Sequence, residues 1–221
     1  MTFSELGAEF GEAACELGLV ASVTHSDANF SEVEESMKHG YNLMTHLYSG
    51  MKGTERKNAY RVAGAVEAGL YFDAYYAEII ADGKHLPIEL LKYIYKAKGP
   101  DRICMITDAI RAAGLPNGAA TKIGSLKRGL DVIVEDDVAK MPDRQSFAGS
   151  TATTDRLYRT MAKAIGTKPE GLVALSKMSS LTPAKLMGLT DRGEIKEGKI
   201  ADINILTPEL ELKMVITDKA N

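Results

Sequence analysis

Cysteine is scarce in this chain, with only two among its 221 residues. Cys15 and Cys104 each lie inside an apolar segment, and they do not have the spacing of a metal-binding or redox pair. A disulfide framework is therefore not expected. We predict two buried free thiols in a reducing compartment.

Long apolar runs are also missing. No segment approaches the ~18 uninterrupted apolar residues of a membrane-spanning helix. Residues 1–20 lack the basic start and the apolar centre of a signal peptide. Low-complexity tracts and solenoid-type repeats are not visible either. These absences predict a cytoplasmic protein that has no membrane partner.

The third feature that the sequence lacks is a basic face. The net charge is -3, and the lysines are scattered along the chain. Binding to a phosphate backbone needs clustered positive charge, so nucleic acid is not expected as a partner. A composition of 45% hydrophobic and 26% charged residues is that of an ordinary globular protein.

Helix and strand patterns alternate over the first half of the chain. Apolar residues at helical spacing predict helices over residues 3–18, 31–40, 58–69 and 87–99. Short apolar segments predict strands at 19–23, at 41–46, within 71–85 and at 101–109. The second helix is expected to start at a cap on Ser31 with a glutamate three residues later. This order predicts an α/β fold with parallel strands and helices that cover the sheet.

The pattern changes after Gly118. Alternating β-branched residues, with turn residues at 127–129 and 135–137, predict a small β-meander inserted at about 121–146. Helical patterns return from about Thr153 to Gly188. The segment 191–221 is typical of short strands joined by turns. We therefore expect an α/β domain over 1–190 and a β appendage over 191–221.

Four ionisable side chains closely follow the predicted strands: His25, His46, His85 and Asp108. The ends of neighbouring parallel strands converge on one face, where ligands bind, so these groups should share a rim. Two neutral imidazoles and a carboxylate suit a zinc or iron site with one position open for water. A single histidine after a strand is more often only hydrogen-bonded or solvated. His39, in the last turn of a predicted helix, suits the helix dipole and is expected to have no function.

Six sequence strings occur one after another along the chain: THSDANF, MTHLYSGM, IADGKHLP, MITDAIRAAGLPNG, FAGST and GEIKEGKIADINIL. Together they resemble the N-acetylglucosamine-6-phosphate deacetylases of the amidohydrolase superfamily over nearly the whole chain. The resemblance implies a TIM-type (β/α)8 barrel with a small β-sandwich built from both ends of the chain. The matching segments begin just before the fifth strand. We therefore expect about strands 5–8 and part of the β-sandwich, without strands 1–4 and the glutamate that the family uses as a metal ligand.

In that family, histidines after the fifth and sixth strands bind a divalent metal, and an aspartate after the eighth strand is the catalytic acid/base. The resemblance thus implies His25 and His46 as metal ligands and Asp108 as the catalytic residue. Zinc or iron is favoured, and manganese or cobalt stays open. Asp108 would take a proton from the attacking water and pass it to the departing amine. The products would be glucosamine-6-phosphate and acetate.

The resemblance also implies residues that contact the amino-sugar phosphate. His85 lies in the ADGxH motif, whose histidine contacts the sugar, and small residues elsewhere would let a pyranose ring approach the backbone. The family commonly has Asn-Ala where this chain has Ser49-Gly50. The phosphate-binding arginine does not align; Arg56 is the first candidate, before Lys57 and Arg61. The implied set is Ser49, Gly50, Arg56, His85, Phe147, Ala148 and Gly149.

Two classes of function remain open at this point. The first is an enzyme or part of one: a metal-dependent carbon–nitrogen hydrolase of amino-sugar catabolism, needing the other half of the barrel and, by family habit, a homodimer. The second is a non-catalytic remnant that keeps the sugar-side loops without a complete metal site. Within the first class, an N-acetylgalactosamine-6-phosphate deacetylase, a dihydroorotase-like enzyme and an amino-acid deacetylase are alternatives.

Overall fold

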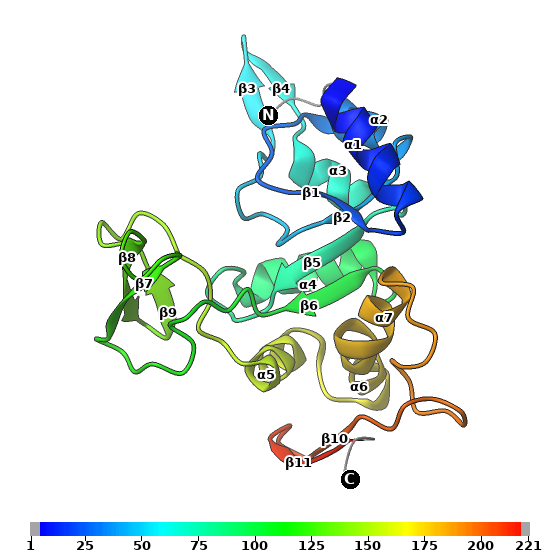
Figure 1. The fold of residues 1–221 in the computed structure, drawn as a ribbon, viewed down its shortest axis with the longest axis vertical. Coiled ribbons are helices and arrows are strands. Elements are labelled where there is room, and N and C mark those ends of the chain that lie inside the picture. Colours follow the sequence, from blue (N-terminus) through cyan, green and yellow to red (C-terminus); the bar gives the residue numbers. More distant parts are fainter. Residues whose placement is uncertain (1–4, 218–221) are drawn as a thin grey trace.

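The computed structural model describes residues 5–217. Its central element is a parallel sheet in the order β1-β2-β5-β6, made of β1 (Ala21–Val23), β2 (Tyr41–Met44), β5 (Tyr76–Ile80) and β6 (Ile103–Ile106). Between and before these strands lie α1 (Glu5–Glu16), α2 (Phe30–Met37), α3 (Ala65–Tyr71) and α4 (Ile88–Lys98). The predicted parallel α/β order is confirmed (Figure 1). Residues 3 and 4 of the first predicted helix and residues 218–221 of the tail lie outside the described residues.

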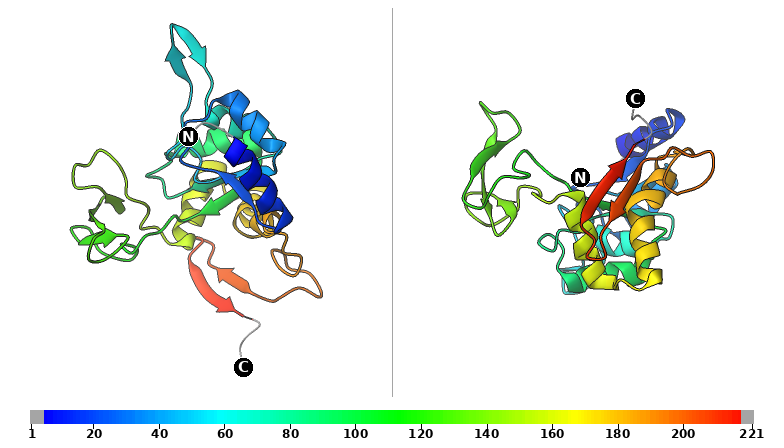
Figure 2. Two further views of the ribbon diagram at one scale, coloured as in Figure 1. Left: turned by 45° about the horizontal axis from the view of Figure 1, so that its top comes forward. Right: turned by 90° about the horizontal axis from the view of Figure 1, so that it is seen from below.

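Helices return in the second half of the chain, as the sequence predicts. They are α5 (Thr154–Ile165), α6 (Pro169–Ser176), the π-helical turn η1 (Lys177–Leu181) and α7 (Thr182–Leu186). Two hairpins and a small sheet surround this body: β3 (Glu55–Lys57) with β4 (Tyr60–Val62), β10 (Ile203–Leu206) with β11 (Leu212–Ile216), and the antiparallel sheet of β7 (Ala120–Ile123), β8 (Leu130–Glu135) and β9 (Val138–Lys140). The β3–β4 hairpin and the β7–β9 sheet project from the body in Figures 1 and 2. No helix within residues 5–217 is long and apolar enough to cross a membrane.

The helix predicted over 58–69 is wrong in its first half. Residues 60–62 form β4, which pairs antiparallel with β3, and the helix begins only at Ala65. The cause is the turn between the two strands, where Asn58 and Ala59 both have positive φ angles, 50° and 70°. A two-residue hairpin turn of this type requires positive φ at both positions, and asparagine adopts that conformation readily.

The start of α2 also differs from the prediction. The Asn29 side chain, not that of Ser31, caps the helix by accepting hydrogen bonds from the N–H groups of Ser31 (3.0 Å) and Glu32 (3.1 Å). The Glu32 carboxylate in turn accepts the Asn29 N–H at 2.9 Å. This reciprocal capping satisfies three N–H groups that a helix start otherwise leaves free. It fixes the end of the loop that follows His25.

The two cysteines lie in different environments. Cys104 is buried on β6, as expected, and burial raises the pKa of its thiol to about 12. Cys15 is exposed, so the expectation that both would be buried is wrong for this residue. Its position on the outer helix α1 explains the difference, because this helix covers one margin of the sheet only.

The main hydrophobic core lies between the parallel sheet and its helices. Its large, fully buried side chains are Tyr75, Met44, Leu47, Ile79, Leu86, Leu91, Ile94, Ile103, Leu157, Met161 and Leu175. A separate small core of Ala112, Val132, Val134, Ala139 and Ala148 supports the β7–β9 sheet. The parallel strands are thus held by dense packing on their helix side, which fixes the positions of their ends.

One buried cation lies at the edge of the main core. Lys98, at the end of α4, is 7% exposed, and its ammonium group donates a hydrogen bond to the carbonyl oxygen of Phe72 at 2.7 Å. Burial lowers the pKa of Lys98 to about 8. The buried ammonium group therefore lowers the free energy of unfolding by an amount that depends on pH.

Candidate active site

Four ionisable residues occupy the same position relative to the four parallel strands. The strands end at Val23, Met44, Ile80 and Ile106, and the second residue beyond each end is His25, His46, Asp82 and Asp108 respectively. Because the strands are parallel, these four residues meet at one end of the sheet.

Three of these residues have an uncommon backbone conformation. The φ angles are 40° at His25, 35° at His46 and 49° at Asp108. Few residues other than glycine adopt positive φ. Strain of this kind costs about 1–3 kcal/mol per residue and clusters at functional sites. The repeated conformation therefore marks this end of the sheet as the candidate site.

The two predicted metal ligands lie together. The ring centroids of His25 and His46 are 4.7 Å apart, with 66° between the ring planes. The Nδ1 atom of His46 is buried and has no hydrogen-bond partner among the described residues. A buried polar atom without a partner is unfavourable unless a ligand satisfies it.

Gly50 makes this arrangement of the histidines possible. It has a φ of +61°, and a Cβ atom built on it would lie 2.3 Å from Cδ2 of the His25 ring. No side chain fits between the loop and the imidazole. The loop after His46 also folds back on this residue, because the Ser49 N–H donates to the His46 carbonyl oxygen at 2.9 Å. The Ser49-Gly50 pair therefore lies beside both histidines.

The histidine pair fits a divalent cation as part of a ligand set. Imidazole suits zinc and iron, and a set completed by carboxylate oxygens would also suit manganese. Catalytic zinc sites usually have three protein ligands. Residues 5–217 contain no group of three histidine, cysteine or carboxylate side chains that could hold a metal ion. Within the described residues, the histidine pair therefore offers a divalent cation two candidate ligands.

Asp108 lies against the predicted substrate loop. The Ser150 N–H donates to the Asp108 carbonyl oxygen at 2.9 Å, and Gly149 has a φ of +99°. A Cβ atom on Gly149 would lie 3.2 Å from that same carbonyl oxygen and 2.6 Å from Cγ2 of Ile110. Glycine is required here by close approach. Ala148, by contrast, belongs to the small core under the β7–β9 sheet.

His85 lies in a constrained pocket of side chains. Its ring centroid is 4.8 Å from that of Phe147, so the two predicted substrate-contacting residues are brought together. The His85 Nδ1 atom lies 2.8 Å from Oδ2 of Asp82. With Asp82 ionised, Nδ1 carries the proton, which leaves Nε2 available to a ligand.

Asp82 is a residue of this rim that the sequence did not predict. Besides the ring nitrogen of His85, its carboxylate accepts the backbone N–H groups of Lys84 (2.8 Å) and His85 (2.9 Å). Burial acts to raise the pKa of Asp82, but these hydrogen bonds outweigh burial and hold the pKa below its ordinary value. The signal that could have revealed Asp82 is its two-residue offset from the end of β5, the same as for the other three residues.

The structure does not bring Arg56 to the strand ends. Arg56 lies on the exposed strand β3 opposite Arg61 of β4, on the projecting hairpin with Lys57 (Figure 1). His39 also lies outside the cluster, as expected, because its Nδ1 atom is 2.7 Å from the Glu12 carboxylate between α2 and α1.

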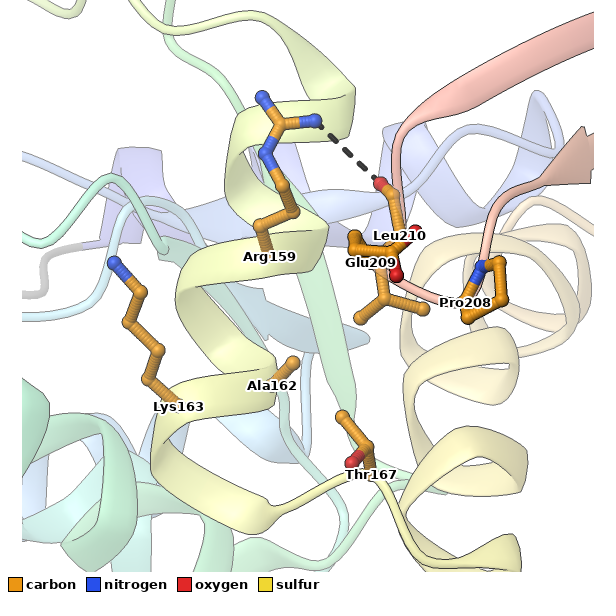
Figure 3. A pocket seen from close by; sticks show the side chains of 7 residues that line it. All are labelled: Arg159, Ala162, Lys163, Thr167, Pro208, Glu209 and Leu210. Atoms are coloured by element: carbon orange, nitrogen blue, oxygen red, sulfur yellow. Dashed lines mark hydrogen bonds between the residues drawn. The ribbon is translucent and has the colours of Figure 1, made fainter.

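A hollow of about 260 Å³ lies elsewhere, between the second half of α5 and the turn that joins β10 to β11 (Figure 3). Arg159 spans it and donates to the Leu210 carbonyl oxygen at 3.5 Å. Its lining residues are Arg159, Ala162, Lys163, Thr167, Pro208, Glu209 and Leu210. None of them is a predicted site residue.

The chain is similar in sequence to known proteins. Residues 16–219 match the sequence model of the amidohydrolase family. The chain is 36% identical over 205 residues to the N-acetylglucosamine-6-phosphate deacetylase of Lysinibacillus sphaericus, covering 93% of this chain and 50% of the relative. It is 32% identical over 193 residues to the N-acetylgalactosamine-6-phosphate deacetylase of Escherichia coli O157:H7, covering 86% of this chain and 47% of that protein.

A solved structure shows the same fold. The crystal structure of N-acetylglucosamine-6-phosphate deacetylase from Thermotoga maritima matches with a TM-score of 0.84 and 33% identity, over 95% of this chain and 54% of that chain. This chain thus spans about half the length of each of these three relatives. The fold predicted from the sequence is confirmed: four strands of a TIM-type barrel with part of a small β-sandwich.

Proposed function

Since the chain belongs to the amidohydrolase family, we propose that it forms part of a metal-dependent hydrolase that converts N-acetylglucosamine-6-phosphate to glucosamine-6-phosphate and acetate. One observation carries this proposal: His25, His46 and Asp108 converge at one end of the sheet in a shared left-handed conformation. The activities named for the relatives support the substrate class.

The proposed metal ligands are His25 and His46, and zinc or iron is the first choice, before manganese or cobalt. A divalent ion, when bound, would polarise the acetamide carbonyl group and make water more acidic. Asp108 would accept one proton from the attacking water and return it to the nitrogen as the C–N bond breaks. Acetate and the free amine are then released, so one water is consumed for each amide cleaved.

The remaining predicted residues would bind the sugar phosphate. His85, held by Asp82 through Nδ1, would present Nε2 to the sugar, and Phe147 would contact the ring. Gly50 and Gly149 would contact the sugar through their backbone, since the space of their missing Cβ atoms is taken by the His25 ring and by Ile110. Ser49 would contribute its hydroxyl group, with Ala148 behind the loop. Arg56 remains the first candidate for the phosphate, before Lys57 and Arg61.

We also propose the wider organisation that the sequence predicts. Residues 1–190 would belong to the barrel, with the β7–β9 sheet as an insertion, and residues 191–221 to the β-sandwich. A cytoplasmic homodimer is the proposed setting.

Two alternatives have specific support. The similarity to a galactosamine-specific relative, at 32% identity, favours the galacto substrate as the second candidate. The absence of a three-ligand group within residues 5–217 favours a non-catalytic remnant. Turnover of the gluco and galacto substrates, measured side by side after mixing the chain with the first half of a relative, distinguishes all three.

The test compares His46→Ala with Asp108→Asn. Metal content and acetate release from N-acetylglucosamine-6-phosphate are measured on the 221-residue chain, alone and mixed with the first half of the Lysinibacillus relative. We expect weak metal binding and little turnover by the chain alone, because two ligands fall short of three. The mixture should restore both.

In the restored mixture the two variants should differ. His46→Ala should lose metal and activity together. Asp108→Asn should keep most of the metal and lose about 10²–10⁴-fold in rate, because an amide cannot accept the proton. His39→Ala is the control and should change neither. Near-normal turnover by Asp108→Asn would contradict the proposed role of this residue.

A further inference from the structure

The turn between β8 and β9 is tied to the start of the second helical region. Asp136 and Asp137 form this turn, and both have positive φ angles, 54° and 59°. The Asp137 carbonyl oxygen accepts two hydrogen bonds, from the Thr151 hydroxyl group at 2.7 Å and from Nη1 of Arg156 at 3.0 Å. Arg156 lies in the first turn of α5. The β7–β9 sheet projects from the body (Figure 1), and this turn therefore connects it back to α5.

Arg156 also reaches the candidate site. Its Nη2 atom donates to the carbonyl oxygen of Asp82 at 3.4 Å. Asp82 is buried at the end of β5, and its carboxylate lies 2.8 Å from Nδ1 of His85. A guanidinium group carries several N–H donors in a fixed planar arrangement, so it can bind two acceptors at once. One side chain thus bridges the inserted sheet and the residue that holds His85.

Phe147 connects the inserted sheet to the site from the other side. The segment that carries it runs antiparallel to β9, with Phe147 opposite Lys140 and the Ala148 N–H donating to the Ala139 carbonyl oxygen at 2.9 Å. The ring of Phe147 lies 4.8 Å from that of His85, centroid to centroid. Because β9 begins directly after the turn that Arg156 holds, the position of Phe147 depends on the position of that turn.

These contacts form a closed ring. Its members, in order, are Arg156, Asp137, β9, Phe147, His85 and Asp82, which contacts Arg156 again. In a closed ring each contact restricts the others, so the guanidinium group of Arg156 limits how far the inserted sheet can move from the end of β5. Loss of this group opens the ring at two contacts.

We propose that Arg156 is a positioning residue that fixes the β7–β9 sheet to the end of β5 and thereby holds Phe147 against His85. Its importance for the sugar rests on the proposed function, since the two rings would form one wall of the sugar site. Arg156 acts through the backbone carbonyl groups of Asp82 and Asp137.

The experiment replaces Arg156 in the 221-residue chain. Arg156→Met removes both donors and keeps an unbranched side chain. The control is Arg159→Met, three residues further along α5. Arg159 is also half-buried and also donates to a backbone carbonyl group of a β hairpin, that of Leu210 at 3.5 Å. Phe147→Leu defines the state in which His85 has no aromatic neighbour at this position.

The first readout is the NMR signal of the His85 ring protons, which a nearby aromatic ring shifts. In Arg156→Met this signal should move toward its position in Phe147→Leu, because Phe147 is no longer held against His85. Arg159→Met should leave it unchanged. Should Arg156→Met fail to fold, Arg156→Lys decides the question, since its single nitrogen cannot reproduce the planar bridge and the signal should move in the same direction. An unchanged His85 signal in the folded variants overturns the proposal.

The second readout separates position from folding. Two amides report on the inserted sheet itself: the Gly118 N–H donates to the Val134 carbonyl oxygen at 2.8 Å, and the Ala148 N–H donates to that of Ala139 at 2.9 Å. Both should exchange with solvent at wild-type rates in Arg156→Met, because the sheet moves as a unit. Faster exchange of both, together with the change at His85, would mean that Arg156 supports the folding of the sheet and would overturn the proposal.

The third readout uses the mixture with the first half of the Lysinibacillus relative. Arg156→Met should raise KM for N-acetylglucosamine-6-phosphate up to roughly tenfold and change kcat less, because it displaces a wall of the sugar site and not Asp108. A fall in kcat at unchanged KM would contradict the positioning role. If the wild-type mixture shows no turnover, the proposed function fails, while the His85 signal still decides the role of Arg156.

Discussion

The parallel sheet and the β7–β9 sheet are built in opposite ways. The parallel sheet joins four strands that are far apart in sequence and rests on a large core of aliphatic and aromatic side chains. The β7–β9 sheet joins neighbouring strands through local turns over a core of five small residues. The strained histidines and Asp108 lie at the end of the first sheet. The three candidate site residues at positive φ thus lie on the sheet that has the larger core.

Three residues at positive φ cost together several kcal/mol, at about 1–3 kcal/mol each, and at His25, His46 and Asp108 the large main core offsets this cost. The β7–β9 region also holds non-glycine residues at positive φ, namely Asp136, Asp137 and Arg144, but these are exposed and lie in its turns and bends. Four predictions test the contrast, from the largest expected effect to the smallest.

The largest effect should follow from Ile79→Ala in β5. Ile79 is fully buried in the main core, so the substitution leaves a cavity and should lower the free energy of unfolding by about 2–5 kcal/mol. Urea denaturation measures this. The matched change is Val132→Ala in β8, which should cost roughly 1–3 kcal/mol and should speed hydrogen exchange in β7–β9 only. Equal loss of protection in α4 after Val132→Ala would show that the two regions unfold together.

The second prediction concerns Lys98. Its folded pKa is about 8 against an ordinary value of 10.5, so the unfolded chain binds more protons between these values. Stability must then rise with pH across that window, by roughly 3 kcal/mol at most, and the full penalty applies below pH 8. Lys98→Met should remove this rise and be more stable at pH 7. Urea unfolding at pH 7, 9 and 10 measures the difference, with exposed Lys96→Met as the control. A parallel rise in Lys98→Met would refute the assignment.

The third prediction concerns Asp82→Asn. Asparagine places an N–H₂ or a neutral oxygen where His85 Nδ1 needs a carboxylate, so stability should fall by about 1–3 kcal/mol at pH 7. Since the folded pKa of Asp82 lies below its ordinary value, its contribution is present above about pH 4 and is lost as pH falls through the folded pKa. The gap between wild type and variant should therefore close in acid. The control, Asp143→Asn in an exposed loop, should leave the free energy of unfolding unchanged at pH 7 and in acid. A difference in stability between the wild type and Asp82→Asn that persists in acid would contradict the ionic role of Asp82.

The smallest effect should follow from Met214→Ser in β11. Met214 is 53% exposed, and exposed substitutions usually change stability by less than about 0.5 kcal/mol. Met161→Ser in α5 is the matched change; its side chain is fully buried, and the loss should be at least about 2 kcal/mol. Thermal unfolding of the 221-residue chain measures both. A large loss from Met214→Ser would show that the β10–β11 hairpin packs more tightly than its exposure indicates.

The sequence predicted what local patterns determine. Apolar spacing predicted α4 and the parallel strands, and the histidines after β1 and β2 were placed correctly at one rim. The β3–β4 hairpin was missed because its turn depends on positive φ at Asn58 and Ala59, which apolar spacing does not register.

Asp82 was missed for a different reason. Its position becomes visible only when the ends of all four strands are known, since its offset from the end of β5 is then seen to be the shared one. Those ends depend on the pairing of segments that are distant in the chain.

The shared offset of two residues beyond each strand has a consequence for redesign. The position of each functional side chain is set by where its strand stops, so the loops downstream are free to vary in length. The segment 51–64, which includes the projecting β3–β4 hairpin, is a natural cassette for exchange. We expect grafted loops to change the surface around the rim, whereas moving the end of β1 or β2 by one residue would displace His25 or His46 from the rim.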